Sequence, residues 1–184
     1  MNELLTKISD HIAEGLEKEK AEAFIKEFKN LEKKRNNSDI LRKLTIWMLV
    51  DKDRGVLKFT KPGSKEYAAI QNVAQLYIDD CKDNEKFLNA HLDAVAASLE
   101  IAAGEYPDSA SHRATRVAVF SASLVDTAND QRRFWSFYDF AVSSYAAAGR
   151  AAFYPTHHSA VAYPAMADKL LELMRVAPTL SLTN

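Results

Sequence analysis

Cysteine, glycine and proline are all scarce in this chain of 184 residues. The only cysteine is Cys81, so the chain cannot form an internal disulfide, and a protein of this size without one fits a reducing compartment. Five glycines and five prolines are too few for a disordered or collagen-like chain. We therefore expect a cytoplasmic protein that folds through a hydrophobic core alone.

Long apolar runs and an excess of one charge are also missing. Charged residues interrupt the first twenty positions, which leaves no apolar stretch for a signal peptide. No segment approaches the roughly 18 consecutive apolar residues that a membrane span needs. The formal net charge of -1 supplies no global field that would draw the chain onto nucleic acid or an anionic membrane. We therefore expect neither a membrane nor a nucleic acid as a partner.

Charge and alanine are distributed unevenly along the chain. Charged residues concentrate in the first 60 positions, whereas most alanines come later. This distribution predicts one helical domain over residues 1–184. Within it, charged amphipathic helices in residues 1–50 precede a packed core, rich in alanine and aromatic residues, in residues 64–178.

Apolar residues recur every three to four positions along most of the chain, which is the period of amphipathic helices. The predicted helices cover residues 2–18, 19–35, 38–50, 64–78, 84–103, 107–128, 131–148 and, starting near His158 or Pro164, a last segment to 176. The first two could also form one helix that bends near Gly15. The expected fold class is therefore all-α, a compact bundle of about seven or eight helices.

The helical period is lost between Asp51 and Gly63, where turn residues flank the run Val56–Phe59. We interpret this stretch as a loop, with a short hairpin around residues 52–62 as the alternative, because the run could be extended. Ser64 follows the loop and is typical of an N-cap, so we expect it to begin the next helix.

Signatures of nucleotide and metal binding are absent. The chain has neither a Gly-x-x-x-x-Gly-Lys-Ser/Thr phosphate loop nor a Gly-x-Gly-x-x-Gly dinucleotide motif, and the segment 61–65 lacks the first glycine of such a loop. It also has no Glu-x-x-His pair, no His-Glu-x-x-His and no Cys-x-x-Cys. His157 and His158 are weak candidates for a metal ligand, with a polar helix start as the favoured alternative. We expect no cofactor.

Polar residues among apolar ones are the best candidates for chemistry, because a buried charge is costly unless it is paired. His91 shares one side of its predicted helix with four apolar residues, which are Leu88, Leu92, Val95 and Leu99. Arg116 follows His112 by one turn, and Asp139 stands between aromatic residues. We predict an ion pair between Asp139 and either Arg113 or Arg116.

This predicted pair has two interpretations. It can be a structural ion pair that joins two central helices. Alternatively, it belongs to a pocket for an anionic ligand, in which arginines and histidine bind a carboxylate or phosphate and tyrosines line a wall. The candidate ligand-binding residues are His91, His112, Arg113, Arg116, Tyr138, Asp139 and Tyr145, with His157 as a possible addition.

A nucleophile for covalent catalysis is not evident. Ser111 and Ser121 are ordinary helix serines, without the tight turn that exposes a catalytic serine. Three aspartates close to Cys81 would raise the pKa of its thiol and so disfavour the reactive thiolate. We therefore expect no catalytic residue.

Two surfaces could bind a macromolecule. A basic cluster near the predicted turn between the second and third helices consists of Lys33, Lys34, Arg35, Arg42 and Lys43. Acidic neighbours dilute it, so a solvated turn is favoured over a nucleic-acid surface. The aromatic residues between Phe134 and Phe140 point in too many helical directions for one narrow core, so a wide core is favoured. The alternative is a surface for self-association or for a partner, on part of this helix or on the first two helices.

These absences favour a helical protein-interaction or regulatory protein without catalytic activity, of inhibitor, immunity or accessory type. We expect its partner to be another protein or a second copy of the chain. The alternative is a helical small-molecule-binding protein or enzyme, whose polar pocket of histidine, arginine and aspartate takes a small anionic ligand.

Overall fold

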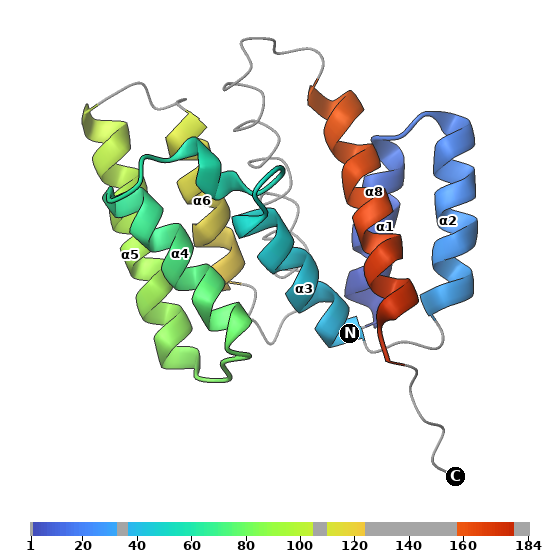
Figure 1. Cartoon of the computed structure of the whole chain (residues 1–184), viewed down its shortest axis with the longest axis horizontal. Coiled ribbons are helices and arrows are strands. Elements are labelled where there is room, and N and C mark those ends of the chain that lie inside the picture. Colours follow the sequence, from blue (N-terminus) through green and yellow to red (C-terminus); the bar gives the residue numbers. More distant parts are fainter. Residues whose placement is uncertain (1, 33–36, 105–109, 124–157, 179–184) are drawn as a thin grey trace. The chain divides into compact units, whose positions relative to one another are not determined.

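The computed structural model describes residues 2–32, 37–104, 110–123 and 158–178 (Figure 1). Over these ranges the chain forms seven α-helices and one short 3-10 helix, and it contains no strand. The all-α bundle predicted from hydrophobic periodicity is confirmed. None of the helices in the described ranges has both the length and the apolar character needed to cross a membrane.

The helices follow the predicted order. They are α1 (Asn2–Glu14), α2 (Lys18–Glu32), α3 (Asn37–Val50), η1 (Val56–Phe59), α4 (Lys65–Ile78), α5 (Asn84–Gly104), α6 (Ala110–Ser123) and α8 (His158–Val176). The chain turns at residues 15–17, so α1 and α2 are separate helices rather than one bent helix. The helix predicted over residues 131–148 lies outside the described residues.

The described residues separate into two compact units. The first contains residues 1–44 and 159–184, and the second contains residues 45–158. The prediction that residues 1–184 form a single domain stays a prediction. Each unit is described by itself below.

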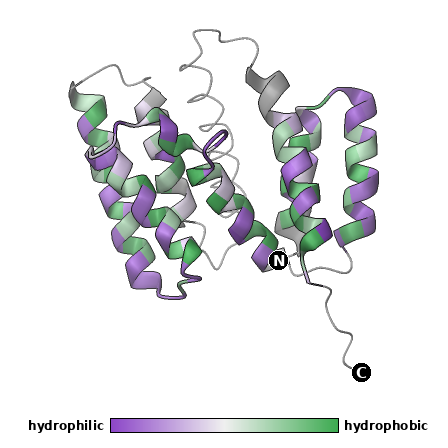
Figure 2. Cartoon of the chain, viewed as in Figure 1, coloured by the Kyte–Doolittle hydropathy of each residue, from purple (hydrophilic) through white to green (hydrophobic). Residues whose placement is uncertain are grey.

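The first unit buries large apolar side chains from α1, α2, α8 and the start of α3. Its buried residues include Leu5, Ile8, Ile12, Phe24, Phe28, Ile40, Leu44, Met166, Leu170 and Met174. Figure 2 shows polar and apolar residues alternating along α2. Two polar contacts also join helices of this unit. Thr6 donates a hydrogen bond to Glu32 at 2.6 Å, and Arg175 of α8 donates two to one carboxylate oxygen of Glu27, at 2.6 and 2.9 Å.

A close contact between Gly15 and Tyr163 also holds the first unit together. A Cβ atom built on Gly15 would overlap with the ring atoms of Tyr163. The aromatic ring therefore lies directly over the glycine backbone, at the point where the chain turns between α1 and α2. Any larger residue at position 15 would push α8 away from this turn or force the ring out of place.

In the second unit, α4, α5 and α6 pack against one another, and η1 contacts α4 and α6. Many of the buried side chains are small, among them Ala69, Ala74, Ala90, Ala94, Ala97, Ala114, Ala118 and Ala122. Tyr77 of α4 packs edge-on against Phe87 of α5, with ring centroids 5.2 Å apart. The hydroxyl of Tyr77 donates a buried hydrogen bond of 2.6 Å to the carbonyl oxygen of Ser121 in α6. One tyrosine thus links all three helices.

The alternative of a hairpin around residues 52–62 is wrong, because Val56–Phe59 forms the 3-10 helix η1. The side chain of Asp51 accepts hydrogen bonds from the next backbone amides, those of Asp53 and Arg54, which curls the chain into a turn. A Cβ atom on Gly55 would overlap with the backbone of Asp51, so glycine allows this tight return. The buried Val56 then anchors the helix.

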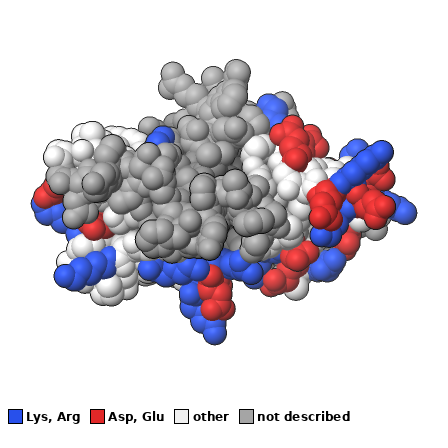
Figure 3. Space-filling model, turned by 90° about the horizontal axis from the view of Figure 1, so that it is seen from above, with Lys and Arg blue, Asp and Glu red and all other residues white. Residues whose placement is uncertain are grey.

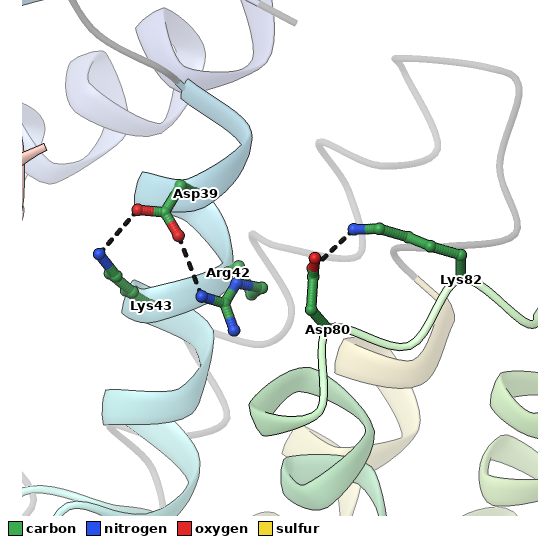
Figure 4. A network of polar contacts seen from close by, with 5 residues as sticks. All are labelled: Asp39, Arg42, Lys43, Asp80 and Lys82. Atoms are coloured by element: carbon green, nitrogen blue, oxygen red, sulfur yellow. Dashed lines mark hydrogen bonds and ion pairs between the residues drawn. The ribbon is translucent and has the colours of Figure 1, made fainter. Parts of the chain in front are cut away.

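The start of α4 agrees with its sequence signal. The backbone amide of Tyr67 donates a hydrogen bond of 3.2 Å to the Ser64 hydroxyl, which confirms Ser64 as the N-cap. At the other end of this helix, Lys82 donates a hydrogen bond of 2.6 Å to Asp80 in the turn that leads to α5 (Figure 4). The helix ends at its C-cap Asp79, whose backbone amide donates a hydrogen bond of 2.9 Å to the carbonyl oxygen of Gln75.

Candidate functional site

The predicted polar site falls partly within the described residues. Four of its members belong to helices of the second unit: His91 on α5 and His112, Arg113 and Arg116 on α6. Four others lie outside the described residues: Tyr138, Asp139, Tyr145 and His157. The ion pair with Asp139 and the anion pocket built around it therefore stay predictions.

His91 connects α5 to α6. Its Nδ1 atom lies 3.0 Å from the carbonyl oxygen of Val119. Because a carbonyl oxygen only accepts, this contact is a hydrogen bond in the tautomer that carries a proton on Nδ1. His112 and Arg116 lie one turn apart on α6, and both are half-buried, so they share a face as the sequence predicts.

The prediction that His91 lies among buried leucines is wrong. The sequence pattern suggested that α5 buries its leucines, yet the side that faces the core contains Phe87 and small residues, namely Ala90, Ala94, Ala97 and Ser98. Leu88, Leu92 and Leu99 are exposed by 47%, 55% and 65%. Val95 is half-buried. Helix α5 thus points its small residues inward and its leucines outward.

We attribute this orientation to the packing of α5 against α6, two helices that contact each other and that both bury alanines. Helix α6 buries small residues at a spacing of one helical turn, Ala114, Ala118 and Ala122. Two helices that meet through alanines approach closely, at the short end of the usual distance of about 8–10 Å between helix axes. Such an interface has no room for leucine, so the larger apolar side chains lie on the other side of α5.

We call the residues Leu88, Leu92, Val95 and Leu99 the leucine ridge. They are separated by four, three and four positions, the spacing of side chains along one edge of a helix. Five large hydrophobic residues are exposed in the described part of the chain, and three of them belong to this ridge. The exposure is therefore concentrated on one helix edge instead of being scattered singly over the surface.

The basic cluster near the start of α3 is partly neutralised. Asp39 accepts hydrogen bonds from Arg42 at 3.0 Å and from Lys43 at 2.7 Å (Figure 4). The other members, Lys33, Lys34 and Arg35, lie outside the described residues. On the face drawn in Figure 3, basic and acidic side chains are interspersed. The expectation of a solvated turn instead of a nucleic-acid surface stays a prediction.

Asp39 has a perturbed pKa. Burial of its carboxylate raises the pKa, but the hydrogen bonds and positive charges of Lys43 and Arg42 lower it by more. The net pKa lies below the ordinary value of an aspartate. Asp39 therefore keeps its charge to lower pH than a solvated aspartate, and it pairs with both basic neighbours at neutral pH.

One polar network in the first unit was not anticipated from the sequence. His11 of α1 is only 12% exposed, and its Nδ1 atom lies 3.2 Å from a carboxylate oxygen of Glu14. Its Nε2 atom lies 3.4 Å from the hydroxyl of Tyr163 in α8. The two rings meet edge to face, with centroids 5.8 Å apart. These contacts join α1 to α8, next to the packing of Tyr163 on Gly15.

The described residues contain no group of three or more histidine, cysteine, aspartate or glutamate side chains that could hold a metal ion. Of the two weak metal candidates, His158 begins α8 and His157 lies outside the described residues. The candidate functional features of the described chain are therefore the leucine ridge and the polar face of α6.

Comparison of this chain with protein-family models, with curated proteins and with solved structures found no match.

Proposed function

We propose that this chain is a helical protein-interaction protein of regulatory type, without catalytic activity, and that it binds its partner through the leucine ridge of α5. The observation that carries this proposal is the exposure of Leu88, Leu92 and Leu99, each by about half or more. Covering apolar surface gains about 25 cal/mol for each Å² removed from water. A contiguous apolar edge of this kind is typical of a protein contact surface.

The ridge contributes little to the fold of its own unit. The opposite side of α5 already supplies the residues that pack against α4 and α6. Leucine at these outer positions is therefore not explained by the core. A role in binding explains both the residue type and its spacing.

The shape of the ridge indicates the kind of partner. It extends over 11 residue steps from Leu88 to Leu99, or about 16 Å along the helix axis. An apolar edge with this spacing fits against a second amphipathic helix, whose side chains fill the gaps between the leucines. We therefore propose a helical segment of another protein chain as the partner.

The anion-binding pocket is the weaker proposal. His112 and Arg116 share a face of α6, but Tyr138, Asp139 and Tyr145, which would complete the pocket, lie outside the described residues. The ridge lies wholly within the described part of the chain. We also propose a cytoplasmic location, supported by the single cysteine, Cys81.

Affinity capture with matched variants tests the proposed function. Leu92→Lys places a charge in the middle of the ridge, and Asn72→Lys adds the same residue at an exposed position of α4. Wild type and Asn72→Lys are expected to retain one stoichiometric protein from the native host, whereas Leu92→Lys retains at least about tenfold less, the equivalent of 1.4 kcal/mol. Equal retention by all three proteins would remove the ridge as the binding surface.

A further inference from the structure

We propose that the leucine ridge also binds a second copy of this chain, through antiparallel pairing of α5 with α5. The inference rests on the proposed function, because it names an occupant of the same surface. It starts from the order of the ridge residues. Their separations of four, three and four positions read the same in both directions along the helix.

A ridge with this symmetry is complementary to itself about a two-fold axis. When two α5 helices lie antiparallel, Leu88 of each copy faces Leu99 of the other copy. Leu92 of each copy then faces Val95 of the other. All four ridge residues find an apolar neighbour, and each contact occurs twice, as an isologous interface requires.

The electrostatics of α5 permit this pairing. No ridge position holds a charged residue, and the acidic residues Asp93 and Glu100 each follow a leucine by one position, about 100° further around the helix. No like charges are buried when two ridges meet. Antiparallel pairing also places the positive end of each helix dipole beside the negative end of the other, which parallel pairing does not.

The size of the ridge sets the strength of the dimer. Stable protein complexes bury about 800 Å² on each partner, and one edge of a single helix offers less. We therefore expect a reversible dimer, with a dissociation constant on the order of 10 µM or weaker. Such a dimer leaves the ridge available to another helix that binds more tightly, so a protein partner would displace the second copy.

Sedimentation velocity of the full chain, from about 1 to about 500 µM, measures this association. Wild type and Asn72→Lys are expected to shift from monomer to dimer as the concentration rises. Leu92→Lys is expected to remain monomeric, with its dimer dissociation constant raised at least about tenfold. Circular dichroism checks that each variant is folded, which we expect because Leu92 is 55% exposed. A wild type that stays monomeric throughout, or a Leu92→Lys variant that dimerises equally well, overturns the proposal.

A mixing experiment tests the direction of the two helices. Leu88→Lys and Leu99→Glu should each weaken self-association when studied alone. In an equimolar mixture, antiparallel pairing places the new ammonium group of the Leu88→Lys variant against the new carboxylate of the Leu99→Glu variant. The second Leu88–Leu99 contact of the pair is kept. The mixture is therefore expected to associate more strongly than either variant alone. A mixture no better than the single variants contradicts the antiparallel arrangement.

The two proposals fail in different ways. A wild type that is monomeric at every concentration but still retains a host protein through Leu92 refutes the second copy and supports the proposed function. A wild type that dimerises through Leu92 but retains no host protein refutes the proposed function and supports the second copy.

Discussion

The first unit and helix α5 of the second unit use apolar side chains in opposite ways. In α2, Phe24 and Phe28 recur at a spacing of one turn and are buried. In α5, Leu88 and Leu92 recur at the same spacing and are exposed. The comparison teaches that hydrophobic periodicity locates an apolar edge on a helix, whereas the space offered by neighbouring helices decides whether that edge faces the core.

Replacing one residue of the buried edge of α2 and one residue of the leucine ridge by alanine should give the largest difference in unfolding free energy. Phe28→Ala removes a fully buried ring and is expected to lower the free energy of unfolding by about 3–5 kcal/mol. Leu92→Ala removes exposed atoms and is expected to change it by no more than about 0.5 kcal/mol. Urea unfolding of both variants at a concentration where the chain is monomeric provides the measurement. Similar losses for the two variants would show that Leu92 belongs to a core.

Gly15→Ala should have the next largest effect, because its methyl group would overlap with the ring of Tyr163. We expect a loss of about 1–3 kcal/mol in unfolding free energy, as for other overpacked sites. Tyr163→Ala in the same chain relieves the overlap, so the double variant should lose less than the sum of the two single losses. Strict additivity would mean that the two residues do not touch.

A larger side chain on the inward or the outward side of α5 compares buried and exposed positions within a single helix. Ala94→Leu inserts a larger side chain into the close interface with its neighbours and is expected to cost about 1–3 kcal/mol. Ala96→Leu makes the same change at an exposed position of the same helix and should stay within about 0.5 kcal/mol. Thermal unfolding of the pair is the test. A neutral Ala94→Leu would imply a roomy interface and remove our reason for the outward leucines.

The smallest expected effect concerns Asp39. Its pKa in the folded chain lies below the ordinary value, so its ion pairs stabilise the fold above the unfolded pKa of about 3.9. This contribution is lost as the pH falls through the folded pKa, because the carboxylate then becomes protonated. Below about pH 4 the unfolding free energy of wild type should decrease as Asp39 becomes protonated. The decrease should be smaller for Asp39→Asn, which has no carboxylate at this position. Identical pH profiles of unfolding free energy for the two proteins would contradict this assignment.

Much of the helix order could be predicted from the sequence because its signals are local. Ser64 caps α4 through an amide three residues later, and the apolar spacing of α1 marks Ile8 and Ile12 as core residues. The conformation of the loop near Gly55 could not be predicted from such local signals. The run Val56–Phe59 suits a strand by composition, but the hydrogen bonds of Asp51 and the close return at Gly55 select a 3-10 helix.

The sequence shows the spacing of the leucine ridge on α5 but not that the ridge is exposed. The sequence of α5 contains two edges that could face inward, one with leucines and one with alanines, and hydrophobicity alone favours the leucines. The alanines of α6 could have indicated the correct orientation of α5. A helix that buries alanines packs closely against its neighbour, so the neighbour must also present small side chains. The contact of His11 with Tyr163 gave no local signal, because 152 positions separate the two residues.

Solvent exposure of the leucine methyl groups tests the central claim most directly. With methyl-labelled Leu92→Lys protein and a soluble paramagnetic probe, the resonances of Leu88 and Leu99 are expected to broaden strongly. Those of Leu44 and Leu170, which are fully buried, should remain sharp. Protection of Leu88 and Leu99 equal to that of Leu44 and Leu170 would show that the chain itself covers the ridge, and it would contradict a binding role for α5.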